Sequence, residues 1–160
     1  MKLLVFSDIH GDLQRLHELM DTEADLYVAL GDLSSWGRNL DACGRVLARR
    51  TGKVLVLPGN HESEDEIAAL CRAHGLETFH GRLREWNGCL LAGLGYSTPT
   101  PFDTPGEYTE EQIRTRLDAF RGRNLLALFC HCPPQGTLLD RTCSGQSIGS
   151  IAVREFIEQE

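Results

Sequence analysis

The sequence lacks a long hydrophobic run, an export signal and an excess of basic side chains. No stretch approaches the roughly 18 consecutive apolar residues that a transmembrane helix needs, so we expect a soluble protein without a membrane partner. The apolar segment 1–6 opens the chain, but Asp8 and His10 follow before it reaches the length of a secretory signal. It is better interpreted as a first strand, and the predicted location is the cytoplasm.

The shortage of basic residues limits which partners the surface attracts. The formal net charge is −7 at pH 7. Nonspecific nucleic-acid binding depends on Lys and Arg side chains that release counterions from phosphates, so this charge disfavours nucleic acid as a partner. A bound phosphate group would therefore need positive charge from another source.

The six cysteines are spread along the chain rather than grouped into a disulfide framework. In a chain of this length without an export signal, scattered cysteines favour reduced thiols, with disulfides as the alternative. Cys130 and Cys132 flank His131, but a Cys-x-Cys pair lacks the usual spacing of a structural zinc site, and no second pair completes four ligands. Packing is the default role for these two side chains.

The length of 160 residues and the hydrophobic content of 41% suit a single domain, residues 1–160, with one core. In the first half, short apolar runs alternate with segments of helical spacing, which predicts a parallel α/β arrangement. Ser63 and Glu66 form a capping box that opens the third helix. The expected strands are 3–6, 26–30 and 54–57, and the expected helices are 12–20, 40–49 and one from 63 onward.

The second half contains a different signal. Asn87-Gly88 separates two apolar runs, 83–86 and 89–94, and this dipeptide is a strong indication of a two-residue β-hairpin. Antiparallel pairing should therefore begin there. After the hairpin we expect, in order, a Thr- and Pro-rich loop at 96–106, a helix opened by a capping box of Thr109 and Gln112, a buried strand at 125–129, and a last helix from 148 to the end.

Side chains that can bind metals follow four of the predicted strands. Ligands of open α/β sheets bind beyond the carboxyl ends of the parallel strands, so these side chains should meet at one edge. Taken singly, an Asp there can cap a helix, an Asn can be a turn residue, and a His can be a hydrogen-bonded core side chain. The combination favours one shared site. Its members are Asp8 and His10 after the first strand, Asp32 after the second, Asn60 and His61 after the third, and His131 after the strand at 125–129.

In these blocks the chain resembles the calcineurin-like metallophosphoesterase family, over residues 2–134. The matching segments are Asp8-Ile9-His10, Gly31-Asp32, Gly59-Asn60-His61-Glu62 and His131. The resemblance implies a two-sheet sandwich flanked by helices, an αββα fold of the α/β class. It also implies two metal ions. Asp8, His10 and Asp32 would hold one ion. Asp32, Asn60 and His131 would hold the other, so that Asp32 bridges them.

The implied function is hydrolysis of phosphomonoester or phosphodiester bonds by a hydroxide that bridges the two metal ions. Carboxylate, amide oxygen and imidazole ligands together suit Mn²⁺, Fe or Zn²⁺ better than Ca²⁺. Two such cations roughly 3.5–4 Å apart can clamp phosphate oxygens and activate water, and they supply the positive charge that the surface lacks. By the resemblance, His61 is the catalytic residue that stabilises the transition state and protonates the leaving oxygen, and Glu62 orients His61.

The closing Gly-His-x-His block of the family is absent, so each implied metal lacks one histidine ligand. The chain ends at Glu160 in a predicted helix without a Gly cap, and we expect a fold that is incomplete at its C-terminal end. The main hypothesis is a hydrolase acting on a small phosphorylated substrate, with the missing ligands supplied by residues beyond Glu160 or by another chain of a homo-oligomer. The alternative is a noncatalytic protein-interaction module on the same fold with an incomplete metal site.

Overall fold

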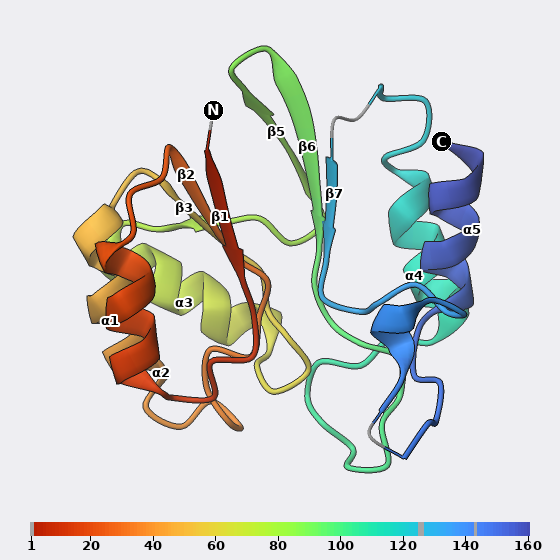
Figure 1. Ribbon diagram of the computed structural model, residues 1–160, viewed down its shortest axis with the longest axis horizontal. Coiled ribbons are helices and arrows are strands. Elements are labelled where there is room, and N and C mark those ends of the chain that lie inside the picture. The colour runs from red at the N-terminus through yellow and green to blue at the C-terminus, as the bar shows by residue number, and fades with distance from the viewer. Residues whose placement is uncertain (1, 125–126, 143) are drawn as a thin grey trace.

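The computed structural model describes residues 2–124, 127–142 and 144–160, and two β-sheets face each other in it (Figure 1). The strands are β1 (Leu3–Phe6), β2 (Leu26–Ala29), β3 (Val54–Val56), β4 (Glu77–Thr78), β5 (Arg82–Trp86), β6 (Cys89–Leu94) and β7 (Ala127–Cys130). The first sheet is parallel throughout, in the order β1-β2-β3-β4. In the second sheet, β6 pairs antiparallel with β5 and parallel with β7.

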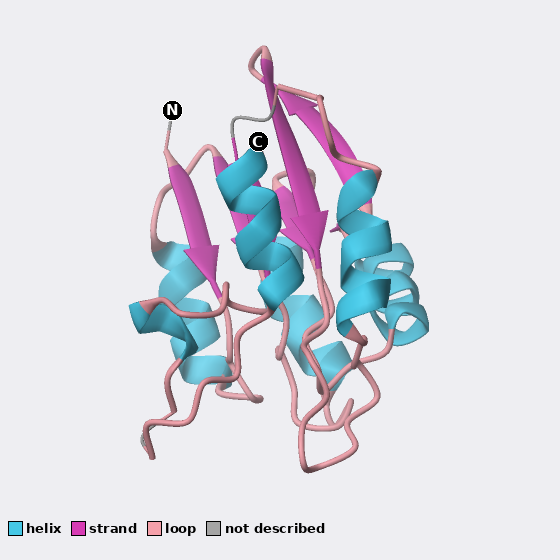
Figure 2. Ribbon diagram, turned by 90° about the vertical axis from the view of Figure 1, so that its right-hand side faces the viewer, coloured by secondary structure: helices cyan, strands magenta, loops and turns pink. Residues whose placement is uncertain are grey.

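Helices cover the outer face of each sheet (Figures 1 and 2). The first sheet carries α1 (Leu13–Asp21), α2 (Leu40–Leu47) and α3 (Glu64–His74), and the second carries α4 (Glu110–Asp118) and α5 (Ile151–Gln159). This order of layers confirms the predicted sandwich of two sheets between helices. None of the described helices is long and apolar enough to span a lipid bilayer.

Alternating side chains divide the apolar core between the layers. Leu26 and Val28 of β2 face the space between the sheets, whereas Tyr27 and Ala29 of the same strand pack against α1, α2 and α3. β6 divides its side chains in the same way, with Leu91 between the sheets. Successive residues of a strand point to opposite faces, so each of these strands is anchored on both sides. Burying one large apolar side chain contributes about 1.5–3 kcal/mol to the stability of the fold. Burial on both faces therefore fixes these strands and the loops at their ends.

The local signals for helix starts and for the hairpin are confirmed. The Ser63 hydroxyl accepts from the amide of Glu66 at 3.2 Å, and the Glu66 carboxylate accepts from the amide of Ser63 at 2.8 Å. Thr109 and Gln112 make the same reciprocal pair at the start of α4. The turn between β5 and β6 has φ values of 50° and 75°, as a type I′ turn requires.

Several predicted boundaries are corrected. The second helix ends at Leu47, and a short 3₁₀ helix follows it at Ala48–Arg50. The last helix begins at Ile151 rather than at 148, because the Ser150 side chain caps it. The strand expected at 125–129 is observed at Ala127–Cys130, and Leu125 and Leu126 lie outside the described residues. The sequence pattern did not predict β4 or the 3₁₀ helix at Leu138–Asp140.

Candidate metal centre

The predicted ligands meet at the carboxyl edge of the strands. The loops that follow β1, β2 and β3 come together there because these strands are parallel neighbours. The loop after β7 reaches the same place from the second sheet, where Nδ1 of His131 lies 3.0 Å from the carbonyl oxygen of Leu30. This contact joins the two sheets at the site.

The backbone of the first three candidate ligands adopts an uncommon conformation. Asp8, His10 and Asp32 have φ values of 57°, 48° and 53°, in the left-handed region. Such conformations cost on the order of 1–3 kcal/mol each and persist where the surroundings hold them. Here the amide of His10 donates to the carbonyl of Asp32 at 2.9 Å, and the amide of Asp8 donates to the carbonyl of Gly31 at 3.2 Å. The loops after β1 and β2 are thereby fastened to each other.

Two glycines allow the loops after β2 and β3 to touch. A Cβ atom at Gly31 would lie 2.2 Å from the amide nitrogen of Gly59, and one at Gly59 would lie 2.0 Å from Oδ1 of Asp32. A larger residue at either position would displace the backbone or the Asp32 carboxylate. Because of this close approach, Oδ1 of Asp32 accepts a hydrogen bond from the amide of His61 at 3.0 Å.

Glu62 is fully buried beneath these loops. One of its oxygens accepts from the amides of Asp32 at 2.9 Å and Gly59 at 3.1 Å, and the other accepts from the amide of Ser34 at 2.7 Å. Burial raises the pKa of Glu62, and these hydrogen bonds act in the opposite direction. Glu62 was expected to orient His61, whereas its carboxylate accepts from backbone amides of the loops after β2 and β3.

Oδ2 of Asp32 lies between two groups of ligand atoms. On one side, Nε2 of His10 is 3.7 Å from it and also 3.7 Å from Oδ1 of Asp8. On the other side, Nε2 of His131 is 3.9 Å from it and 3.2 Å from Oδ1 of Asn60. The side chain of Asp32 is 4% exposed and that of Asp8 is 62% exposed, so solvent reaches the centre from the Asp8 side. Asp32 is the residue that both groups share.

The hydrogen bonds of His131 and Asn60 leave two lone pairs facing each other. The carbonyl oxygen of Leu30 only accepts, so Nδ1 of His131 donates to it, and the tautomer that carries this one hydrogen leaves a lone pair on Nε2. The amide nitrogen of Asn60 donates to the hydroxyl of Thr104 at 3.3 Å, which turns Oδ1 toward Nε2. Two acceptors 3.2 Å apart repel each other unless a cation lies beside them. Together with the carboxylate of Asp32, this set of donor atoms fits a divalent metal ion.

Thr104 is in turn held by Glu107. One carboxylate oxygen of Glu107 accepts from the hydroxyl of Thr104 at 2.5 Å, from its amide at 2.9 Å, and from the hydroxyl of Thr100 at 2.6 Å. Because the Thr104 hydroxyl gives its one hydrogen to Glu107, its lone pairs face Asn60. Burial tends to raise the pKa of Glu107, but the hydrogen bonds from Thr100 and Thr104 outweigh it and lower the pKa. An ionised Glu107 therefore fixes the direction of these hydrogen bonds.

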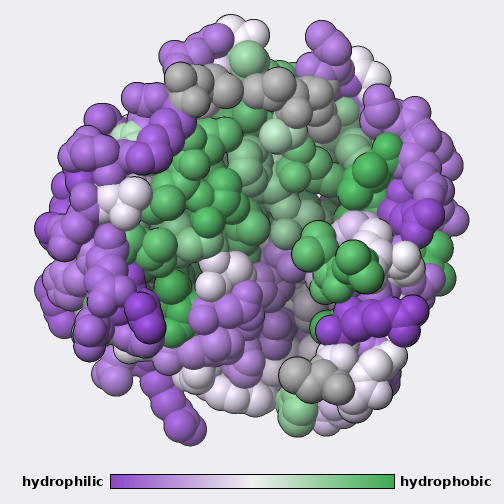
Figure 3. Space-filling model, viewed as in Figure 1, coloured by the Kyte–Doolittle hydropathy of each residue, from purple (hydrophilic) through white to green (hydrophobic). Residues whose placement is uncertain are grey.

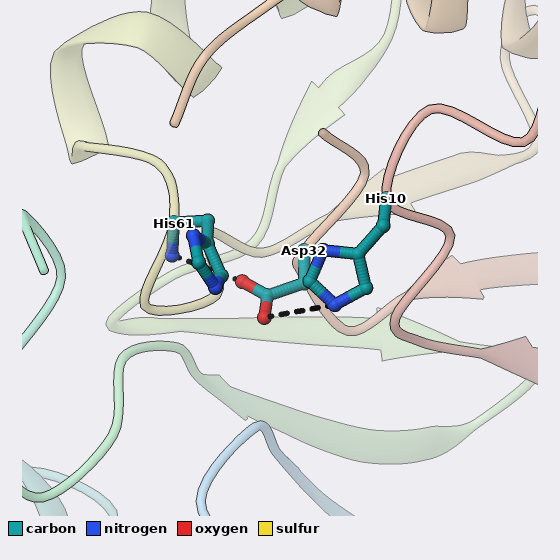
Figure 4. Close-up of side chains that lie close together, drawn as sticks. All are labelled: His10, Asp32 and His61. Atoms are coloured by element: carbon teal, nitrogen blue, oxygen red, sulfur yellow. Dashed lines mark hydrogen bonds and ion pairs between the residues drawn. The ribbon is translucent and has the colours of Figure 1, made fainter. Parts of the chain in front are cut away.

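His61 lies beside His10 and Asp32 (Figure 4). The ligating atoms of the three residues lie within 4.8 Å of one another, so His61 can bind an ion or act on a substrate held by one. Its ring packs edge-to-face against His10, with centroids 5.1 Å apart, and against Trp36, with centroids 5.5 Å apart. Nδ1 of His61 is buried and has no hydrogen-bond partner among the described residues. Such an unpaired atom is costly, and functional sites are where it is tolerated.

All the residues that the sequence analysis selected are found at this edge. It missed Trp36, Thr104 and Glu107, which contact or orient the selected side chains. The Thr- and Pro-rich composition of 96–106 marked the loop that carries Thr104, but no local pattern assigned it to Asn60. The selected residues are Asp8, His10, Asp32, Asn60, His61 and His131.

Comparisons with known proteins give the family of this chain. The chain is 30% identical over 163 residues to the uncharacterized protein MJ1162 of Methanocaldococcus jannaschii, with 99% of this chain and 73% of that protein aligned. A solved crystal structure superimposes with a TM-score of 0.75 at 18% identity, covering 98% of this chain and 79% of that one, which supports the fold. Residues 1–148 match the family model for calcineurin-like phosphoesterases, and the chain therefore belongs to that family.

Proposed function

We propose that the protein is a metal-dependent phosphoesterase that hydrolyses phosphomonoester or phosphodiester bonds with two divalent ions, manganese being the first candidate. The observation that carries the proposal is the position of Asp32 Oδ2 between two groups of ligand atoms. It lies 3.7 Å from Nε2 of His10 and 3.9 Å from Nε2 of His131. Membership of the phosphoesterase family supports the same activity.

The ligand atoms suit two ions that share one carboxylate. Asp8, His10 and Asp32 would hold one ion, and Asn60 and His131 would join Asp32 in holding the other. When bound, the ions would offset the charge of phosphoryl oxygens and lower the pKa of a water molecule for in-line attack. His61, beside this centre, would protonate the leaving oxygen.

A pocket of about 790 Å³ adjoins the candidate ligands, which supports a small-molecule substrate. Asp8, Asn60 and His131 are among the residues that line it, and segments 97–102 and 146–149 form much of its walls. Small-molecule sites typically measure about 300–1,000 Å³. A small phosphate ester therefore has room to reach the metal centre.

Metal-dependent hydrolysis of generic esters tests the proposal. Protein stripped of metal by a chelator should not hydrolyse bis(4-nitrophenyl) phosphate or 4-nitrophenyl phosphate, and added Mn²⁺ should restore release of 4-nitrophenol. His131→Asn should weaken this response, whereas His17→Asn, on the exposed side of α1, should not. If folded protein hydrolyses neither ester at saturating Mn²⁺, the proposal is wrong and the noncatalytic module is favoured.

A further inference from the structure

The pocket beside the metal centre is lined by described residues of little charge. Among the described residues that line it there is no Lys or Arg, and most of the polar ones carry hydroxyl or amide groups, such as Ser97, Thr98 and Gln146. Apart from the predicted ligands, the one charged side chain among them is that of Glu110. Any positive charge in the pocket would therefore be concentrated at its metal end.

Glu110 also fills the place in the wall that would best receive an anion. The side chain of Glu110 lies at the N-terminus of α5, and a helix N-terminus attracts negative charge. The carboxylate of Glu110 already accepts from the amides of Ile151 and Ala152, each at 2.9 Å, and from the hydroxyl of Ser150 at 2.7 Å. Burial tends to raise the pKa of Glu110, but these hydrogen bonds lower it, so the group is ionised. These donors are therefore already bound to Glu110 and are not available to a second anionic group of a ligand.

The pocket walls also expose large apolar side chains. Phe102 and Leu139 are 71% and 77% exposed, and Ile148 is exposed as well, although all three line the pocket. Exposed apolar groups around a concave site are typical of surfaces that cover an apolar ligand. The hydroxyl of Thr98 donates to the carbonyl of Ile148 at 2.9 Å, which ties the two walls together.

Resting on the phosphoesterase activity proposed above, we propose that the substrate is a small phosphate ester with a single phosphoryl group and an uncharged, partly apolar organic group. The phosphoryl group would bind at the metal end, and the organic group would lie against Phe102, Leu139 and Ile148. A second phosphate or carboxylate would lie against lining residues that include no Lys or Arg, near the negative charge of Glu110. Nucleoside polyphosphates, sugar bisphosphates and nucleic-acid strands are thereby disfavoured.

Two phosphonates of equal size separate the charge of the organic group from its shape. 4-Carbamoylbenzylphosphonate carries a neutral amide where 4-carboxybenzylphosphonate carries a carboxylate, and hydrolysis does not cleave their carbon–phosphorus bonds. Isothermal titration calorimetry with Mn²⁺-loaded protein gives both dissociation constants without relying on turnover. The neutral probe should bind about three- to tenfold more tightly, the range expected for like charges some distance apart in a hydrated pocket.

A pair of charge variants locates the effect in the pocket. Gln146→Arg places a cation in the wall and should bring the two dissociation constants to within about twofold of each other. Gln159→Arg makes the same change at the end of α5 that lies away from the pocket loops, and it should leave the ratio as it is (Figure 1). Phe102→Lys, at an exposed wall position, replaces Gln146→Arg if that variant does not fold.

The outcomes distinguish this inference from the function on which it rests. Equal binding of the two probes by the unmodified protein, or tighter binding of the carboxylate, would overturn the substrate class and leave the phosphoesterase activity standing. An unchanged ratio in both Gln146→Arg and Phe102→Lys would overturn it as well. Failure of both probes to bind would also overturn it, and the nitrophenyl assay would then decide whether the hydrolase activity falls too.

Discussion

At the scale of single residues, the direction of the Asn60 amide depends on Thr104 and Glu107, two side chains outside the ligand set. Thr104→Val removes the hydroxyl that accepts from Asn60 and leaves the amide free to turn its nitrogen toward the metal site. Loss of a group that orients a metal ligand typically costs about 10–100-fold in metal affinity, and Mn²⁺ affinity should fall by that amount. Calorimetric titration measures it. Thr115→Val, on the exposed face of α4, is the matched control, and equal affinity of the two variants would remove Thr104 from this role.

His61 lies close enough to the ligands for either proton transfer or metal binding, and one substitution separates these roles. If His61 protonates the leaving oxygen, His61→Gln should cost roughly 10²–10⁴-fold on esters with alkoxide leaving groups. Nitrophenyl esters should lose less, because nitrophenolate departs without a proton. Elemental analysis of the variant supplies the second readout. Loss of bound metal together with equal losses on both classes of ester would identify His61 as a ligand instead.

The meeting of the candidate ligand residues at one edge could be predicted because each follows a strand inside a short motif. Asp8 and His10 are two residues apart, and Gly31 and Gly59 mark the close contact of two loops. The orienting residue Thr104 could not be predicted in this way. It lies 44 positions from Asn60, and nothing in its own neighbourhood indicates which amide it faces.

At the scale of elements, His80 connects the segment after β4 to the chain that follows β6 and to the chain that precedes α4. Nδ1 of His80 accepts from the amide of Gly95 at 2.9 Å, and Nε2 lies 3.1 Å from the hydroxyl of Tyr108, just before α4. Burial lowers the pKa of His80 below its ordinary value. Protonation of Nδ1 would break the bond to Gly95, so the neutral ring is the form that holds these elements together.

The lowered pKa of His80 predicts how stability depends on pH. The unfolded chain takes up the proton near pH 6.5 and the folded chain only at lower pH, so acid favours the unfolded state between these values. This contribution is fully present above pH 6.5, and it is lost as the pH falls, by up to about 1.4 kcal/mol per pH unit. His80→Gln should flatten the curve of unfolding free energy between pH 7 and pH 5, as followed by denaturant titration. Thr115→Val, a change at an exposed position of α4 that does not titrate, should keep the slope. Matching slopes for His80→Gln and the unmodified protein would contradict the assignment.

The elements that local sequence determines were predicted well, and those that depend on distant contacts were not. The starts of α3 and α4 are set by capping boxes whose two residues are only three positions apart in the chain. They are Ser63 with Glu66 and Thr109 with Gln112. The start of α5 is set by the cap residue Ser150 and also by Glu110, whose carboxylate accepts from amides more than 40 positions away. β4 has two residues, which is too short for a periodic pattern to appear.

At the scale of the whole molecule, the two sheets present open edges on one face. Among the described strands, β1 pairs only with β2, and β7 pairs only with β6. Hydrophobic side chains gather on this face over the region between the sheets (Figure 3). Unpaired edges beside apolar surface favour pairing with another chain. The homo-oligomer expected from the sequence would bring a second copy of this protein, with the same open edges, to this face, and we propose that arrangement.

Val5 of β1 provides a test of this association because it is 43% exposed on an open strand. A charge on an edge strand opposes pairing, so Val5→Lys should shift the protein toward the monomer. Sedimentation equilibrium over a range of concentrations measures the shift. Leu138→Lys changes an exposed apolar residue outside the sheets and should leave the association unchanged. A monomeric unmodified protein, or equal association of both variants, would show that these edges do not pair.

The metal content of Asp32→Asn tests the shared centre most directly, because Asp32 lies beside both groups of ligand atoms. Elemental analysis after equilibration with Mn²⁺ and gel filtration gives the number of ions per folded chain. Asp118→Asn, at an exposed side chain of α4, controls for the loss of one carboxylate. The unmodified protein and Asp118→Asn should each retain about two ions, and Asp32→Asn should retain fewer, with its hydrolysis of nitrophenyl esters lost in parallel. A folded Asp32→Asn protein that keeps as many ions as the unmodified chain would contradict the bridging role of Asp32 and, with it, the proposed two-metal centre.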